Sequence, residues 1–130
     1  MTYTSFEQLE CWQLCRDVRV WITVFCKTLP KEEQYDLKDN IRRAARSSTR
    51  NIAEGFGRHH HGENLQFCRI SRGSLFEILD DLITAKDDAY LSEEKYQEGK
   101  TKVEAAIKSV NGYLKYLNGL LQNQKQNPKP

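Results

Sequence analysis

Hydrophobic residues recur at steps of three and four along nearly the whole chain, with polar residues between them. This spacing is typical of amphipathic α-helices, whose buried side returns every 3.6 residues. Breaks in the pattern leave four predicted helices, over residues 5–28, 35–56, 63–90 and 93–122. Alternating patterns typical of β-strands are short and weak. The sequence therefore predicts an all-α protein.

Helix-ending and helix-starting residues mark the predicted boundaries. Pro30 closes the first segment, and Ser92 is expected to cap the fourth. Gly55 and Gly57 stand at the end of the second segment, where we expect them to adopt the left-handed conformation that ends a helix. Because the connections are short, consecutive helices should be antiparallel, which gives an up-down-up-down four-helix bundle.

A chain of 130 residues suits one domain. We expect the bundle to cover residues 1–121 and a disordered polar tail to cover residues 122–130. A bundle this long and thin would gain from burying surface in an oligomer. The first ten residues lack the features of a signal peptide, and no apolar run approaches the roughly 20 residues that cross a bilayer. We therefore expect a cytoplasmic protein without a membrane partner.

The second predicted helix separates a buried stripe from an arginine-rich face. The stripe consists of apolar and small residues at helical spacing, namely Leu37, Ile41, Ala44, Ala45, Ser48, Ile52 and Phe56. The planar guanidinium group of arginine donates two parallel hydrogen bonds to a phosphate. The candidate contacts to an RNA or DNA backbone are therefore the arginines of this segment, Arg42, Arg43, Arg46, Arg50 and Arg58. Lys100, Lys102 and Lys108 are possible auxiliaries.

The charge distribution leaves a second interpretation of these arginines open. The net charge is only +2, but segment 38–61 carries six basic and two acidic residues, whereas 62–99 carries four and nine. The arginines can therefore pair with acidic residues of the third helix, within a subunit or between subunits. The candidate acidic partners are Asp80, Asp81, Asp87 and Asp88.

Polar residues among small ones favour a structural network over a catalytic centre. Asn51 and Glu54 are three residues apart on one predicted helix, as are Ser74 and Glu77 on another. If these helices touch, the four side chains can form an internal network with Arg50 or Arg72. A di-iron bundle needs Glu-x-x-His twice, and the sequence contains none. We therefore expect no enzyme and no cofactor.

The remaining candidates have plain structural interpretations. Consecutive histidines at 59–61 cannot all face one metal, and no further ligand completes a site, so we expect surface histidines and no metal. Near the chain start, aromatic side chains either stack on nucleic-acid bases or seal an end of the bundle; they are Tyr3, Phe6 and Trp12. The four cysteines are expected to be reduced and to fill the core; they are Cys11, Cys15, Cys26 and Cys68.

Two motifs resemble a known bacterial family. They are the stretch from Arg42 to Arg58, which contains Asn51-Ile52-Ala53-Glu54-Gly55, and Arg72-Gly73-Ser74 followed by Glu77. Both resemble the "four helix bundle protein" family, also called intervening-sequence proteins because some are encoded within 23S ribosomal RNA genes. The opening around Trp12 and the segment after Leu29 are similar too, so the likeness spans about residues 5–121.

This resemblance implies an antiparallel four-helix bundle that forms a homopentameric ring without known catalytic residues. More distantly, the chain is similar to accessory proteins of diversity-generating retroelements, which bind a reverse transcriptase and nucleic acid. The resemblance implies packing or interface roles for Asn51, Glu54, Gly55, Arg72, Gly73, Ser74 and Glu77. The sequence departs from the family where Ser48-Thr49-Arg50 replaces a proline-containing stretch, and where Ser71 replaces alanine.

The sequence as a whole favours a non-enzymatic oligomer whose arginine face binds RNA or DNA. The alternative is a protein-interaction adaptor or structural oligomer whose arginines serve contacts with subunits or a partner protein.

Overall fold

The computed structural model describes residues 3–126, which form four α-helices, two single-turn 3-10 helices and no strand. The elements are η1 (Phe6–Gln8), α1 (Glu10–Cys26), η2 (Lys31–Glu33), α2 (Leu37–Gly57), α3 (His61–Asp87) and α4 (Glu93–Gln126). The predicted all-α fold with four helices is confirmed.

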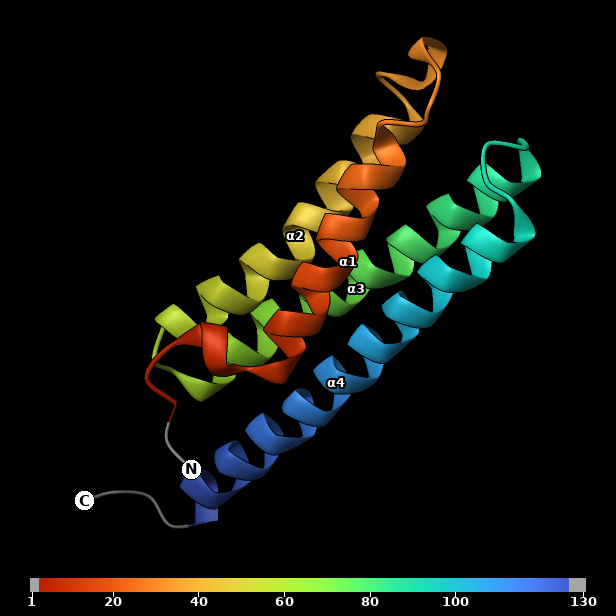
Figure 1. Cartoon of the computed structure of the whole chain (residues 1–130). Helices are drawn as coiled ribbons and strands as arrows, with labels where there is room; N and C mark the ends of the chain where they lie inside the picture. The colour runs from red at the N-terminus through yellow and green to blue at the C-terminus, as the bar shows by residue number, and fades with distance from the viewer. Residues whose placement is uncertain (1–2, 127–130) are drawn as a thin grey trace.

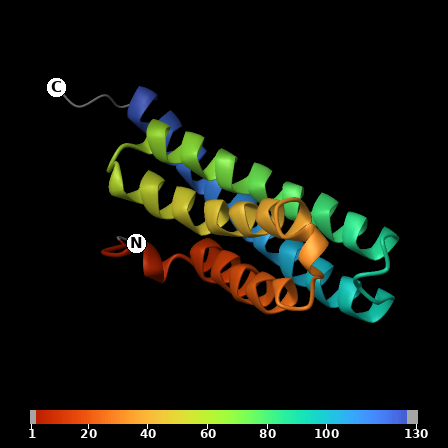
Figure 2. The ribbon, with the colours of Figure 1, turned by 90° about the horizontal axis from the view of Figure 1, so that it is seen from above.

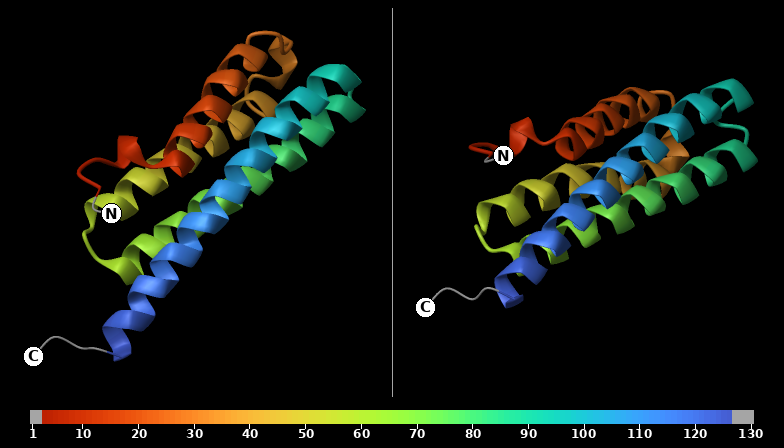
Figure 3. Two further views of the ribbon diagram at one scale, coloured as in Figure 1. Left: turned by 60° about the horizontal axis from the view of Figure 1, so that its bottom comes forward. Right: turned by 90° about the horizontal axis from the view of Figure 1, so that it is seen from below.

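The four helices pack side by side around one core (Figures 1 and 2). α1 contacts α2 and α4, while α3 contacts the same two helices from the other side. The ribbon doubles back at each of the three connections between helices (Figure 1). α4 is the longest helix, and its last turns extend past the start of α3 (Figure 3).

The core follows the predicted hydrophobic periodicity closely. In α2, every stripe residue except the half-buried Phe56 is buried. Small side chains on this stripe let α2 approach its neighbours closely, and Ser71 Oγ of α3 donates a 2.7 Å hydrogen bond to the backbone oxygen of Ser48. The four cysteines are free and buried, as predicted for core residues.

Gly99 allows a close contact between α4 and two of its neighbours. A Cβ at this position would lie 2.7 Å from Trp21 Cη2 and 3.2 Å from Leu82 Cδ1. Trp21 is held there because its Nε1 donates a 2.7 Å hydrogen bond to Glu98 Oε1. The indole of α1 therefore packs directly on the backbone of α4.

The predicted first helix is interrupted near its start. Ser5 caps η1 by accepting a hydrogen bond from the Glu7 backbone nitrogen, and Leu9 then adopts an extended conformation with a ψ of 124°. This extended residue prevents η1 from continuing into α1, which begins at Glu10. The prediction of one continuous helix from residue 5 was therefore wrong.

The two glycines near the end of α2 do not adopt the left-handed conformation that we predicted. The helix continues through Gly57, and the positive φ of 51° falls on His59. Histidine enters this region more readily than most residues. Gly55 instead permits close packing, because a Cβ there would lie 2.7 Å from Asn64 Oδ1 and 3.0 Å from Phe67 Cβ.

The fourth helix has the predicted start and a later end. Ser92 Oγ accepts a 3.1 Å hydrogen bond from the Lys95 backbone nitrogen, which confirms the predicted N-cap. Residues 122–126, which we assigned to a disordered tail, are helical. Glutamine and lysine have good helix propensity, so they extend α4 without needing tertiary contacts. The rest of that predicted tail, residues 127–130, lies outside the described residues.

Candidate nucleic-acid interface

Four of the five predicted phosphate-binding arginines converge on one surface of α2, which we call the arginine face (Arg42, Arg43, Arg46 and Arg50). Together with Asp39 they line a cavity of about 230 Å³. Arg43, Arg46 and Arg50 are exposed, and Arg42 is half-buried. Residues three and four apart on a helix are surface neighbours, so the buried stripe of α2 necessarily places these guanidinium groups together.

Most of the arginine face has no carboxylate partner within the described part of the chain. Arg43 pairs with Asp39 one turn earlier on the same helix. Arg42, Arg46 and Arg50 make no ion pair with any of residues 3–126. Pairing with the acidic residues of α3 within one subunit, which the sequence left open, is therefore not seen. Pairing of these arginines with acidic residues of another subunit belongs to the proposed function below.

The fifth arginine, Arg58, lies apart from this face. Its Nε lies 3.4 Å from Glu54 Oε2, and its Nη1 lies 3.8 Å from Glu63 Oε1. Its guanidinium carbon also sits 5.1 Å from the ring centroid of Phe67. These contacts link the end of α2 to the start of α3, and Arg58 does not line the cavity.

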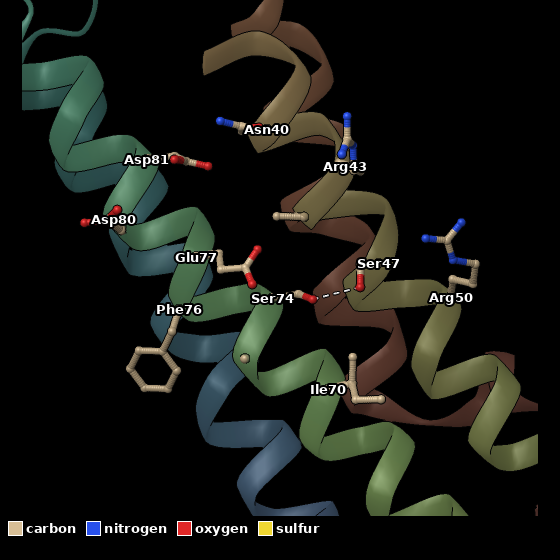
Figure 4. A pocket seen from close by; sticks show the side chains of 12 residues that line it. Asn40, Arg43, Ser47, Arg50, Ile70, Ser74, Phe76, Glu77, Asp80 and Asp81 are labelled. Carbon is tan, nitrogen blue, oxygen red and sulfur yellow. Dashed lines mark hydrogen bonds between the residues drawn. The ribbon is translucent and has the colours of Figure 1, made fainter. Parts of the chain in front are cut away.

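A larger groove of about 880 Å³ runs between α2 and α3 (Figure 4). Arg43 and Arg50 form its basic wall on α2. Its acidic wall on α3 consists of Glu77, Asp80 and Asp81. Glu77 and Asp81 extend toward α2, whereas Phe76 points away from it (Figure 4). The groove therefore carries opposite charges on its two sides.

The pKa of Asp81, one of the three residues of the acidic wall, is shifted by its surroundings. Burial raises the pKa of Asp81 to about 6, and the negative charges of Asp80 and Glu77 add to this effect. Burial and like charges both disfavour the ionised carboxylate. Asp81 therefore takes up its proton at a higher pH than an ordinary aspartate does.

Small polar residues join the two helices at the floor of the groove. Ser74 Oγ donates a 2.8 Å hydrogen bond to Ser47 Oγ, shown as a dashed line in Figure 4. Asn51 Nδ2 donates 2.9 Å hydrogen bonds to Ser47 Oγ and to the Ser47 backbone oxygen. This network contains Asn51 and Ser74, as expected, but it is centred on Ser47, which sequence reasoning missed.

The other residues expected to join this network serve elsewhere. Glu54 pairs with Arg58, and Glu77 lines the groove. Arg72 Nη1 donates a 2.9 Å hydrogen bond to Asn111 Oδ1, which links α3 to α4. A Cβ at Gly73 would meet no atom of residues 3–126 within 4 Å, so this glycine is not needed for packing inside the described chain.

Two large apolar residues on the groove were not predicted. Ile70 is 51% exposed and Phe76 is 54% exposed, and both line the groove from α3. The sequence feature that could have identified them is their position outside the buried stripe of α3. Apolar residues are spread around much of this helix, which made that position hard to recognise. An apolar side chain that faces away from the core indicates a contact surface when others lie beside it.

The remaining candidates lie outside the arginine face. Lys108 lines a separate cavity of about 600 Å³ between α1 and α4, and Lys100 and Lys102 line none of these cavities. His60 Nδ1 accepts a 3.1 Å hydrogen bond from the Glu63 backbone nitrogen and so caps α3. Over residues 3–126, no group of three or more His, Cys, Asp or Glu side chains is placed to hold a metal ion.

The helices and their charges define a class of protein, a small four-helix protein with a strongly basic second helix. No helix within residues 3–126 is long and apolar enough to cross a membrane. The chain belongs to the family of 23S rRNA-intervening sequence proteins, whose sequence model matches residues 7–112. The family resemblance inferred from the motifs is thus confirmed. A comparison with curated proteins finds no match.

Proposed function

We propose that the arginine face binds the phosphate backbone of RNA or DNA and that the protein acts without catalysis. The observation that carries this proposal is the convergence of Arg42, Arg43, Arg46 and Arg50 on one cavity, with one carboxylate, Asp39, among them. Exposed arginines in such a cluster offer several bidentate donors to successive phosphates. Contacts of this kind are strong at low salt and carry little sequence preference.

Repulsion among the clustered arginines destabilises α2 in the free protein, and this supports the proposal that the cluster binds an anionic ligand. Like charges three or four residues apart destabilise a helix by about 0.2–0.5 kcal/mol per pair. Arg46 has such neighbours on both sides, at Arg42, Arg43 and Arg50. A bound phosphate backbone would remove this repulsion, whereas the exposed pair with Asp39 offsets little of it.

The experiment that tests the proposal is binding of structured RNA and duplex DNA over a range of salt concentrations. We expect affinity to fall steeply with salt, by about 0.9 log units per log unit of salt for each phosphate contact on duplex DNA. The double variant Arg43→Glu, Arg46→Glu should lose most of the binding. Arg16→Glu with Arg69→Glu makes the same charge change at exposed positions outside the cavity and should retain it.

Two results would contradict nucleic-acid binding by this surface. One is the absence of binding at low salt, and the other is equal binding by wild type and by the Arg43, Arg46 variant.

A second candidate function is assembly through the groove between α2 and α3. We infer that this chain folds as an up-down-up-down bundle and that its copies form a homopentameric ring, as the family resemblance implies. Support comes from the opposite charges of the two walls and from the exposed Ile70 and Phe76 beside them. If the basic wall of each copy pairs with the acidic wall of the next, the contact is heterologous, and such contacts form a ring where the rotation between copies closes. Light scattering tests this, since a monomer would refute it.

A further inference from the structure

A pocket rich in aromatic side chains lies at the end of the molecule where α2 turns into α3. We call it the aromatic pocket. It has a volume of about 390 Å³, and its rings come from segments far apart in the sequence. Its aromatic and imidazole side chains include Tyr3, Phe56, His59, His61, Tyr113 and Tyr116. The 3-10 helix η1, the turn between α2 and α3 and the last turns of α4 lie at this end of the molecule (Figure 3).

The pocket continues into a second depression between α1 and α4. Tyr3, Tyr113 and Tyr116 line both cavities, so the two form one surface. The second cavity has a volume of about 600 Å³, and its lining contains one basic residue, Lys108, and one acidic residue, Glu10. Of the three aromatic residues near the chain start, only Tyr3 lines these cavities, because Phe6 and Trp12 pack edge to face with centroids 5.2 Å apart.

The tyrosine rings of α4 are held in place while still open to a ligand. The ring planes of Tyr113 and Tyr116 are 24° apart with centroids 6.0 Å apart, and Tyr116 is 43% exposed. Asn64 Nδ2 donates a 3.0 Å hydrogen bond to Tyr113 Oη and fixes that ring. Burial raises the pKa of Tyr113 to about 12, so its hydroxyl group is protonated at neutral pH and can donate a hydrogen bond to a ligand.

The chemistry of the lining suits a planar heterocycle. Ring faces and leucines offer stacking and apolar contact, while the imidazoles and the Tyr113 hydroxyl group offer hydrogen-bond donors and acceptors at the edges. No carboxylate is among the described residues that line the aromatic pocket; the nearest acidic group in contact with a lining residue is Glu63, whose Oε2 lies 3.6 Å from His60 Nδ1. A nucleobase has this combination of an aromatic face and a hydrogen-bonding edge.

We propose that the aromatic pocket binds an unpaired nucleobase of single-stranded RNA or DNA, with Tyr116 as the stacking platform. The inference rests on the proposed nucleic-acid function, since it names the part of the ligand that this end of the bundle recognises. Phe56 lies six residues beyond Arg50 on α2, which is about 9 Å along the helix axis and about 120° around it. About three stacked nucleotides cover the axial distance, and a strand that contacts both residues also passes partly around the helix.

The test uses the full chain, labelled 12-nucleotide strands of oligo-U RNA and oligo-dT DNA, and a 12-base-pair DNA duplex. Tyr116→Ala should weaken binding of single strands about tenfold, since stacking contributes that order of affinity per base. Duplex binding should not change, because paired bases are not free to enter the pocket. Tyr116→Phe should retain binding because it keeps the ring. Tyr35→Ala is the matched control, as Tyr35 is 86% exposed and lies outside the pocket.

Comparing oligo-U RNA with oligo-dT DNA shows which nucleic acid supplies the bound base. Equal losses for oligo-U and oligo-dT upon Tyr116→Ala indicate recognition of the base alone, and a loss confined to one strand assigns the pocket to that nucleic acid. Unchanged affinity of Tyr116→Ala for both strands overturns the proposal. A changed subunit number in light scattering, with unchanged affinity, would overturn it as well, because the pocket would then be an assembly surface.

A second measurement separates this inference from the arginine proposal. Free AMP and UMP, titrated while NMR shifts of Tyr113, Tyr116 and the three histidines are followed, probe the pocket without a phosphate backbone. Shifts at these residues support the pocket even if Arg43→Glu, Arg46→Glu leaves strand binding intact. Their absence overturns the pocket even if that arginine variant abolishes strand binding.

Discussion

Asp81 is the residue whose protonation most directly couples the groove to pH. In the unfolded chain an aspartate titrates near pH 4, whereas the pKa of Asp81 in the folded chain is raised to about 6. Asp80 and Glu77 surround it on α3, and Arg43 and Arg50 face the groove from α2. The protonated carboxyl group is therefore the form that the fold favours.

The sign of the resulting pH dependence follows from proton linkage. Between about pH 4 and pH 6 the folded chain binds more protons than the unfolded chain, so the contribution of Asp81 to stability is lost as pH rises through this window. We expect Asp81→Asn to raise the free energy of unfolding at pH 7 and to flatten its dependence between pH 4 and pH 6. Urea unfolding at four pH values measures both effects. Parallel pH profiles for variant and wild type would contradict this.

At the scale of single residues, the sequence predicted surface positions better than contacts. It placed the arginine face correctly, because helical periodicity alone decides which side of α2 is exposed. It did not predict that Arg58 is engaged by Glu54, Glu63 and Phe67, since two of these belong to the next helix. Periodicity also did not predict the close approach at Gly55, because such an approach depends on what faces the glycine, and only the family resemblance implied a packing role there.

At the scale of one element, the basic residues of α2 outnumber the acidic residues of the same helix, so the helix keeps a net positive charge. Arg46 lies three or four residues from Arg42, Arg43 and Arg50, so its removal relieves three repulsive pairs. We expect Arg46→Gln to stabilise the free protein by about 0.6–1.5 kcal/mol at low salt, and the gain should shrink as salt screens the charges. Thermal unfolding at two salt concentrations measures this difference.

The matched control for Arg46→Gln is Lys115→Gln on α4. The residues three and four positions away from Lys115 are asparagines and glycines, so removing its charge relieves no such pair within the helix. Similar gains for both variants would show that total charge, and not the cluster, determines the effect.

Helix identity was easier to predict than helix ends. The stripes of α2 and α4 depend on many residues, so a single unusual one does not hide the period. An end depends on one or two residues, as at Leu9, where an extended backbone separates η1 from α1. The last turn of α4 was assigned to a tail because its residues are polar, although polar residues of good propensity continue a helix.

At the scale of the whole molecule, the opposite charges of the groove walls predict how copies contact one another. The basic wall of one copy should pair with the acidic wall of the next. We therefore expect Arg43→Glu with Arg50→Glu to reduce the subunit number, and Asp80→Arg with Asp81→Arg to do the same. Combining all four substitutions should restore assembly, because it exchanges the signs of the walls. Light scattering reports the mass, and circular dichroism confirms that each variant is folded.

The combined variant is the informative member of this series. If all four substitutions together leave the protein as dissociated as either pair alone, the walls do not pair with one another between copies. If the single pairs leave the mass unchanged, the groove does not form the subunit contact.

The buried cysteines have a practical consequence for studying this molecule. All four thiols are enclosed, and burial raises the pKa of Cys15 to about 11 and that of Cys68 to about 12. A thiol reacts as the thiolate, so a closed bundle resists alkylating reagents. The rate at which these native side chains become modified therefore measures how often the core around α1 and α3 opens to solvent, without any label or substitution in the chain.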